Sequence, residues 1–187
     1  MLRRCRYDAR QKIKELSTQL SQYLNSCSIL ELDSIDCNEE NIKNLLSGPS
    51  IIYVDGGNTF YLQKHILSSQ FWKPIMNHLK DSNSIYIGVS AGAIVAGKSI
   101  KTAYWKGWDD PSVVGDDFQW NNERLNGLGI VDCSFFMHYN EEIYKNLINS
   151  HQNELNHPLI TITDENALIY QLLSPNDPMA TLITDYK

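Results

Sequence analysis

The sequence predicts an α/β fold in which a doubly wound, mostly parallel sheet carries helices on both faces. Three observations predict it. Short apolar runs alternate with helical stretches along the chain, the order expected of βαβ units. The run Ser50–Val54 is apolar without alternation, which suits a strand covered on both faces. The run Ile85–Val89 is followed at once by a glycine-containing turn and a helical stretch.

Strand, turn and helix alternate along residues 1–96. Apolar residues recur at helical spacing between Asp8 and Leu24, and polar residues separate them. Asn38 precedes two glutamates, the arrangement of an N-cap and a first helical turn, so a second helix is expected through Leu46. The same patterns predict strands at 28–32, 50–54 and 85–89 and helices at 59–67, 72–79 and 91–96.

The alternation fails between Lys98 and Asn126, where three tryptophans lie among Gly, Asp and Asn. Loops of this length are often functional. No repeat or linker interrupts the chain, so residues 1–187 are expected to form a single domain. Beyond the loop, the sequence predicts strands at 135–137, 159–163, 167–172 and 181–184, a helix at 141–154, and a turn at 174–178.

Composition excludes several functions. The 187 residues carry a formal net charge of −6, which argues against a nucleic-acid surface. No apolar run approaches the roughly 20 residues of a membrane helix, and none follows the basic N-terminus as in a signal peptide. The four cysteines form no C-x-x-C pair, which argues against a zinc site or a disulfide framework. We therefore expect a cytoplasmic protein without metal or cofactor and without nucleic-acid or membrane partners.

The segment Gly88-Val89-Ser90-Ala91-Gly92 matches the G-x-S-x-G pattern between a predicted strand and a predicted helix. A sharp turn at this point exposes the serine hydroxyl at the carboxyl end of the sheet. The first N–H groups of the helix then point toward any oxyanion that forms there. The motif predicts that Ser90 is a nucleophile.

A second glycine-rich turn, Asp55–Thr59, follows the preceding predicted strand. Ligands of open parallel sheets bind beyond the carboxyl ends of the strands, so this turn and Ser90 are expected at one edge. Its glycine pair can present a backbone N–H as the second donor of an oxyanion hole. A plain glycine-rich turn, or a phosphate loop without the P-loop lysine, is the alternative.

A serine nucleophile needs a base, and His138 has the best position among the five histidines because it follows the predicted strand at 135–137. The other four lie in helical stretches or in a polar turn: His65, His78, His151 and His157. Position alone leaves the carboxylate that orients the imidazole open. The candidates are Glu165, Asp164, Asp132, Asp116 and Asp117.

Four blocks occur in order along the chain: Tyr53–Phe60, Ile87–Ala93, Leu128–Asp132 leading into His138-Tyr139-Asn140, and Asp164–Ala167. Together they resemble the peptidase E family, serine peptidases that include alpha-aspartyl dipeptidase. The resemblance runs from about Asp8 to the C-terminus. It implies a fold similar to that of class I glutamine amidotransferases, with serine in place of the amidotransferase cysteine.

The resemblance implies a serine peptidase that hydrolyses small peptides in the manner of a dipeptidase. Ser90 would be the nucleophile and His138 the general base. The N–H groups of Gly57 and Ala91 would hold the oxyanion while an acyl-enzyme forms and is hydrolysed.

The resemblance also bears on the acid and on substrate contacts. Glu165 matches the triad acid of some members, which would make the triad Ser-His-Glu. Other members carry an Asp upstream of the histidine, which here falls near Asp116. Residues of the same blocks are expected to contact the substrate: Asn58, Thr59 and Tyr139.

Two departures from the family pattern bear on assembly and specificity. Family members begin with a strand, a helix and a second strand before the helix that residues 8–24 resemble, and the chain has no counterpart of them. A fragment or mis-started gene product, or a sheet completed by a partner such as a second copy in a homodimer, would account for this. The segment Tyr139–Glu154 holds Lys145 and His151 but no arginine, so a bidentate clamp for a substrate aspartate is not expected there.

Two other functions stay open. An α/β-hydrolase esterase shares the serine turn, but its order Ser–acid–His would make His151 or His157 the base and Asp132 the acid. A catalytically inactive binding or assembly domain would fit the shortened N-terminus. Against it stand an intact serine, histidine and glutamate at the family positions.

Overall fold

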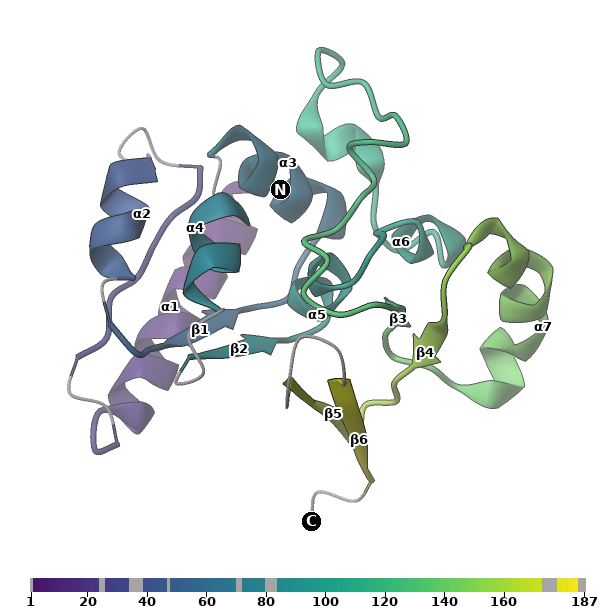
Figure 1. The fold of residues 1–187 in the computed structure, drawn as a ribbon. Helices are drawn as coiled ribbons and strands as arrows, with labels where there is room; N and C mark the ends of the chain where they lie inside the picture. Colours follow the sequence, from purple (N-terminus) through teal and green to yellow (C-terminus); the bar gives the residue numbers. More distant parts are fainter. Residues whose placement is uncertain are drawn as a thin grey trace.

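The computed structural model describes residues 2–23, 26–33, 39–46, 48–69, 72–79, 84–172 and 178–184 (Figure 1). The first half holds α1 (Leu2–Leu20), α2 (Glu39–Leu45), β1 (Ile51–Val54), α3 (Thr59–Ser68), α4 (Trp72–His78), β2 (Ile85–Gly88) and α5 (Ala91–Ala96). The second half holds α6 (Thr102–Trp105), η1 (Pro111–Val114), β3 (Ser134–Phe136), α7 (Glu141–His151), η2 (Gln152–Glu154), β4 (Leu159–Thr161), β5 (Asn166–Leu172) and β6 (Pro178–Thr184).

The order of helices and strands agrees with the sequence prediction except in two segments. No strand forms at 28–32: no described strand pairs with this run, and its leucines pack against the core as irregular chain. The loop predicted over 98–126 contains α6 and η1, and η1 begins where the Asp110 carboxylate accepts a hydrogen bond from Ser112 N–H. Asn38 and the turn at 174–177 lie outside the described residues.

The described strands form three pairs, and two of them are parallel. Strand β1 pairs with β2 from Ile51↔Ile85 to Val54↔Gly88, and β3 pairs with β4 from Ser134↔Leu159 onward. Strands β5 and β6 form an antiparallel pair. Helices alternate with the parallel strands, so the predicted α/β class is confirmed.

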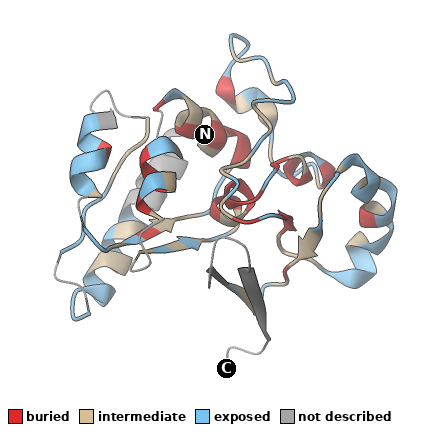
Figure 2. Cartoon of the chain, in the orientation of Figure 1, coloured by how far each residue is buried: buried red, intermediate tan, exposed pale blue. Residues whose placement is uncertain are grey.

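The core lies around α3, α5 and α6, where buried residues gather in the middle of the molecule (Figure 2). Ile52 of β1 is buried on one face of the β1–β2 pair, whereas Ile51, Ile85 and Ile87 are 47%, 53% and 40% exposed. One face of this pair is therefore open within the described residues. The largest core cluster comprises Ile42, Ile52, Phe60, Ile66, Ile75, Ile94, Val95, Ile100, Ala103 and Val114.

Helix α5 packs against the carboxyl end of β1 with almost no space between the two backbones. A Cβ at Gly92 would lie 2.1 Å from Val54 O, and a Cβ at Gly88 would lie 2.6 Å from Gly92 O. Val89 N–H donates to Val54 O at 3.0 Å, and Tyr86 O–H donates to Gly92 O at 2.7 Å. The glycines of the G-x-S-x-G motif are therefore required by packing as well as by the turn.

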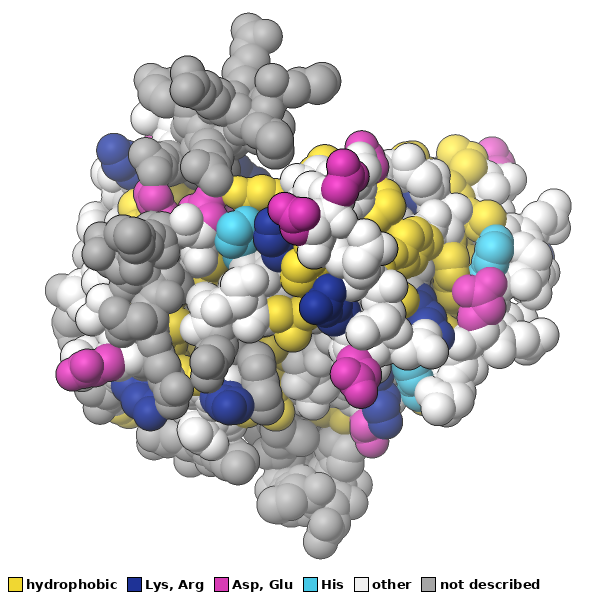
Figure 3. Space-filling model, turned by 90° about the horizontal axis from the view of Figure 1, so that it is seen from above, with side chains coloured by type: hydrophobic (Ala, Val, Ile, Leu, Met, Phe, Trp, Pro, Cys, Tyr) yellow, Lys and Arg dark blue, Asp and Glu magenta, His cyan; other side chains and the backbone are white. Residues whose placement is uncertain are grey.

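The surface carries charges of both signs. Seen from above, acidic and basic side chains lie interspersed among apolar ones, without a continuous basic area on that face (Figure 3). Among the described residues, every helix is too short or too polar to cross a membrane.

We expect Gly92→Ala to lower the free energy of unfolding by at least about 2 kcal/mol, because the new methyl group meets backbone atoms that cannot move aside. Thermal unfolding should show a midpoint lower by roughly 5 °C or more. Gly48→Ala is the matched control, because no atom lies within 4 Å of a Cβ at that position. Equal stability of the two variants would contradict the close packing of α5 on β1.

Candidate active site

Ser90 lies in the turn between β2 and α5, with φ 50° and ψ −109°. A positive φ is costly for a residue other than glycine, and such strain persists only where the surroundings impose it. Here Ser90 O accepts hydrogen bonds from Ala93 N–H and Ile94 N–H, both at 3.0 Å. Although Ser90 is the N-cap of α5, its side chain makes no capping hydrogen bond. The hydroxyl is therefore available for another partner.

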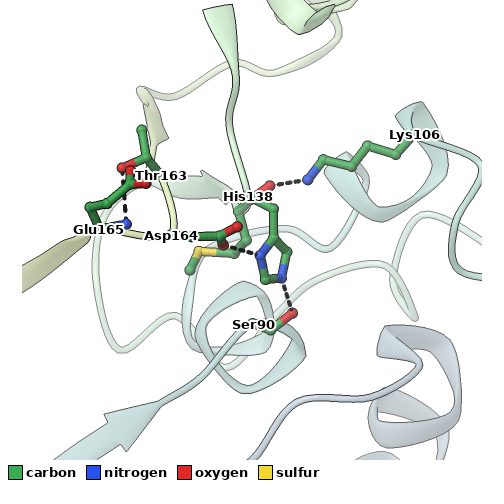
Figure 4. A network of polar contacts seen from close by, with 7 residues as sticks. Ser90, Lys106, His138, Thr163, Asp164 and Glu165 are labelled. Carbon is green, nitrogen blue, oxygen red and sulfur yellow. Dashed lines mark hydrogen bonds and ion pairs between the residues drawn. The ribbon is translucent and has the colours of Figure 1, made fainter.

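That partner is His138. Ser90 Oγ lies 2.8 Å from His138 Nε2, although 48 positions separate the two residues in the chain (Figure 4). His138 follows β3 and also has a positive φ, of 55°. The backbone on either side of it is bound to the chain after β4, since Ile162 N–H donates to Phe136 O and Tyr139 N–H to Ile162 O.

The second imidazole nitrogen, His138 Nδ1, is bound by the carboxylate of Asp164 (Figure 4). Because β3 and β4 are parallel and Phe136 is paired with Thr161, the segments that follow the two strands leave the sheet at the same edge. A carboxylate on Nδ1 selects the tautomer with the proton on Nδ1, which leaves Nε2 free to accept the Ser90 proton. The three side chains form a continuous Ser–His–Asp chain of hydrogen bonds.

Glu165, expected as the acid, is not at the histidine. Its backbone N–H donates to Thr163 Oγ1 at 3.3 Å, and its exposed carboxylate lies apart from the imidazole in Figure 4. Asp164 and Glu165 lie in the turn between β4 and β5, and this turn directs the Asp164 carboxylate to His138 Nδ1. The geometry therefore favours Asp164, which position in the sequence had left as an alternative.

The turn that was expected to supply an oxyanion donor lies against Ser90. A Cβ at Gly56 would lie 3.1 Å from Ser90 Cβ and 3.7 Å from Ser90 Oγ, so the turn passes within van der Waals distance of the serine. Gly57 has φ 135°, a conformation that favours glycine. Ala91 is the first residue of α5, where an N–H has no acceptor within the helix. The turn that contains Gly57 and the first residue of α5 therefore both lie next to Ser90, and their roles as oxyanion donors stay predictions.

Of the three expected substrate contacts, Thr59 is inaccessible to solvent. Its side chain is fully buried, and its N–H donates to Asp109 Oδ2 at 3.1 Å. Asn58 caps α3 by accepting from Tyr61 N–H at 2.9 Å. Tyr139 is half-buried and packs edge-on against a core phenylalanine. Asn58 and Tyr139 stay candidates for contact, but a fully buried Thr59 does not.

The other histidines have partners elsewhere. His157 Nε2 lies 2.7 Å from Ser134 Oγ, and His78 Nε2 lies 2.6 Å from Ser50 Oγ. His151 binds Glu154 at 2.7 Å, and the ring of His65 packs against that of Tyr61. The remaining acid candidates are also placed elsewhere: Asp132 pairs with Lys98 at 2.9 Å, and Asp116 and Asp117 are exposed.

Two residues of the loop after α6 lie at the site and were not singled out by sequence. The ring of Trp108 is 63% exposed, and its centroid lies 6.0 Å from that of His138. Lys106 donates from Nζ to Met137 O, the carbonyl immediately before His138. Partial burial lowers the pKa of Lys106 to about 8, while Asp164 and Asp109 act in the opposite direction. The tryptophan-rich irregular sequence over 98–126 was the signal that pointed to this loop.

The site is open to solvent. The His138 side chain is 37% exposed and that of Asp164 is 72% exposed. Within the part of the chain that the structure describes, no group of three or more His, Cys, Asp or Glu side chains is arranged to hold a metal ion. The arrangement can remove a proton from a serine hydroxyl and return it to a leaving group.

Fold and site together define the class: an α/β protein with a serine held between a histidine and a glycine turn at the carboxyl edge of parallel strands. Residues 6–172 match Peptidase family S51, and the chain belongs to that family. An uncharacterized peptidase of Listeria innocua serovar 6a is 29% identical over 153 residues, covering 75% of this chain and 68% of the relative. An uncharacterized peptidase of Pasteurella multocida is 27% identical over 149 residues, covering 74% of this chain and 68% of the relative.

Solved structures agree with the fold. A peptidase E-like protein from Listeria monocytogenes EGD-e superposes with a TM-score of 0.60 at 22% identity, over 83% of this chain and 69% of that one. A peptidase from an acI-B1 Actinobacterium superposes with a TM-score of 0.60 at 19% identity, over 94% of this chain and 67% of that one. The expected peptidase E family and its fold are confirmed.

We expect Asp164→Asn to reduce kcat on the order of 10²- to 10⁴-fold, because an amide does not hold the Nδ1-protonated tautomer or stabilise an imidazolium. Glu165→Gln should change kcat less than about threefold. The rate at which a fluorophosphonate labels Ser90 tests both variants without a known substrate. A large loss in Glu165→Gln with none in Asp164→Asn would restore Glu165 as the acid.

Proposed function

We propose that this chain is a serine peptidase that hydrolyses small peptides through Ser90, His138 and Asp164 by way of an acyl-enzyme. The observation that carries the proposal is the 2.8 Å contact between Ser90 Oγ and His138 Nε2, with the Asp164 carboxylate on the opposite ring nitrogen. A nucleophile, a base within hydrogen-bond reach and a group that orients the base are the minimum for this chemistry. Membership of a peptidase family supplies the substrate class.

In the first half of the reaction, His138 Nε2 takes the hydroxyl proton as Ser90 Oγ attacks the peptide carbonyl. The new C–O bond places a negative charge on the carbonyl oxygen, to which the N–H groups of Gly57 and Ala91 would donate hydrogen bonds. The Asp164 carboxylate stabilises the imidazolium through Nδ1–H. When the C–N bond breaks, Nε2–H gives its proton to the leaving amine, and Ser90 remains as an ester of the acyl group.

In the second half, water repeats the sequence on the ester. His138 Nε2 takes a proton from water, and the resulting hydroxide adds to the ester carbonyl. Collapse of the second tetrahedral intermediate breaks the bond to Ser90 Oγ, which recovers its proton from His138. Loss of one oxyanion donor in such a site typically costs about 10²- to 10³-fold in kcat.

The order of the three residues in the chain distinguishes this proposal from the esterase alternative. Esterases with the same serine turn place the acid before the histidine. Here the histidine that contacts Ser90 comes first, and the carboxylate that contacts the histidine follows it. His157 and His151, the bases that the esterase would need, are bound to Ser134 and Glu154.

Specificity for an N-terminal aspartate is not part of the proposal. The helix after the histidine, α7, has no arginine, and its Lys145 is paired with Glu141 at 2.8 Å. His151, in the last turn of the helix, is paired with Glu154. A substrate carboxylate would therefore compete with protein carboxylates for each of these cations.

We expect Ser90→Ala to lose at least about 10⁴-fold in kcat while keeping its unfolding midpoint, because the hydroxyl is the nucleophile and makes no capping hydrogen bond. The assay is hydrolysis of a dipeptide library, with fluorophosphonate labelling of the wild type. Ser150→Ala on the exposed face of α7 is the control and should keep full activity. A wild-type chain that cleaves no dipeptide and resists the probe would remove the proposal.

We also expect kcat/KM for Asp-Xaa dipeptides to lie within about tenfold of the value for the corresponding Asn-Xaa dipeptides, since α7 offers no bidentate clamp. Steady-state rates on matched pairs measure the ratio. A preference for aspartate above about 100-fold would mean that a cation outside α7 binds the substrate carboxylate.

A further inference from the structure

Lys106 lies in a cage of aromatic rings beside the backbone of the histidine that contacts Ser90. Its Nζ lies 4.5 Å from the centroid of Trp108, 4.4 Å from that of Phe136 and 5.1 Å from that of Tyr144. These rings come from the loop after α6, from β3 and from α7. The lysine therefore contacts three elements at once.

The ammonium of Lys106 donates a hydrogen bond to the backbone beside His138. Nζ donates to Met137 O, and Figure 4 shows Lys106 approaching from the side of the histidine away from Ser90. The carbonyl of Met137 belongs to the peptide that precedes the positive φ of His138. An anchored carbonyl fixes the orientation of that peptide, and with it the direction in which the imidazole leaves the chain.

The environment of Lys106 is unfavourable for a positive charge, although the cage compensates in part. Aromatic faces attract a cation, and a charged donor makes a hydrogen bond roughly twice as strong as a neutral one. Burial nevertheless lowers the pKa of Lys106 to about 8, so the ammonium is held at a cost to the folded state below that pH. A charge that costs stability beside a catalytic group suggests a role in activity.

We propose that Lys106 is a positioning residue, whose ammonium holds Met137 O and thereby keeps His138 between Ser90 and Asp164. The inference rests on the proposed peptidase function. It adds a fourth side chain, one that touches neither the substrate nor the reacting atoms.

The groups that face Lys106 decide whether activity rises or falls when Lys106 loses its proton. Asp164 and Asp109 favour the charged form, desolvation disfavours it, and the Tyr144 ring contributes its face rather than a charge. The proposed mechanism places a positive charge on the His138 ring during the reaction, and a charged Lys106 would oppose that imidazolium. If positioning dominates, activity falls as Lys106 loses its proton above about pH 8; if repulsion dominates, activity rises there.

The test compares wild type, Lys106→Met and Lys106→Arg in the full chain, from pH 6 to pH 10. Methionine fills the aromatic cage without a charge or a donor, and arginine keeps its charge throughout this range. Lys64→Met is the matched control: Lys64 Nζ also donates to a backbone carbonyl, Val114 O, at 2.8 Å beside a phenylalanine ring, away from the histidine. The measurements are kcat and KM on a dipeptide, the rate of fluorophosphonate labelling, and thermal unfolding.

We expect Lys106→Met to lower kcat and the labelling rate by about 10- to 100-fold at pH 7, with KM within about threefold, because a displaced base loses catalysis rather than binding. Its unfolding midpoint should equal or exceed that of the wild type. Wild-type activity should decline above about pH 8, and this decline should be absent in Lys106→Arg. Lys64→Met should match the wild type.

Four results would overturn the inference while leaving the peptidase function intact. They are an unchanged kcat in Lys106→Met, a rise in KM alone, wild-type activity that increases above pH 8, and a loss of activity that follows a lowered unfolding midpoint without recovery in Lys106→Arg. If Lys106→Met does not fold, Lys106→Arg decides: activity extended above pH 8 supports the inference, and an inactive or wild-type-like profile overturns it. An unreactive Ser90 in the wild type is a separate failure, of the proposed function itself.

Discussion

The contact between the first turn of α5 and the carboxyl end of β1 sets the position of everything else at the site. Gly92 lies so close to Val54 O that no side chain fits between them, and Val89 is tied to the same carbonyl. With strand and helix held this closely, the connecting residue has to make the turn within a single position. Ser90 does so at a positive φ, which points its hydroxyl away from the backbone it would otherwise cap.

A second strained residue faces the first. His138 also has a positive φ, and it follows a strand whose register with β4 is maintained by hydrogen bonds on both sides of it. Non-glycine residues in this conformation each cost on the order of 1–3 kcal/mol and are found where surrounding structure imposes them. Two such residues in direct contact, from distant parts of the chain, indicate that the geometry of the pair is maintained at the expense of local stability.

The electrostatics of the site are those of an exposed site rather than a sealed one. The side chain of Asp164 is largely exposed, so solvent screens its charge, and the surrounding loop carries both a cation and carboxylates. Exposure weakens each charge interaction relative to a buried triad. Hydrogen bonds that hold the backbone beside His138 therefore contribute more to the orientation of the imidazole here than they would in a buried site.

Much of the chemistry follows from the sequence because it depends on local pattern. The apolar strand, the glycine pair and G-x-S-x-G predict Ser90, the turn beside it and the edge of the sheet where they meet. His138 follows from its place after a strand.

The sequence does not decide whether Asp164 or Glu165 is the acid, because adjacent residues are equivalent in sequence position. Only the path of the turn after β4 decides which of them faces the imidazole.

The aromatic cage around Lys106 cannot be predicted from the sequence either, since its rings come from elements that approach one another only when the chain is folded. By itself the sequence determines which residues can react and on which edge of the sheet they lie, because strand and turn preferences are local. The tertiary structure alone decides which partner each of them has, because pairing across long separations depends on packing that no local pattern encodes.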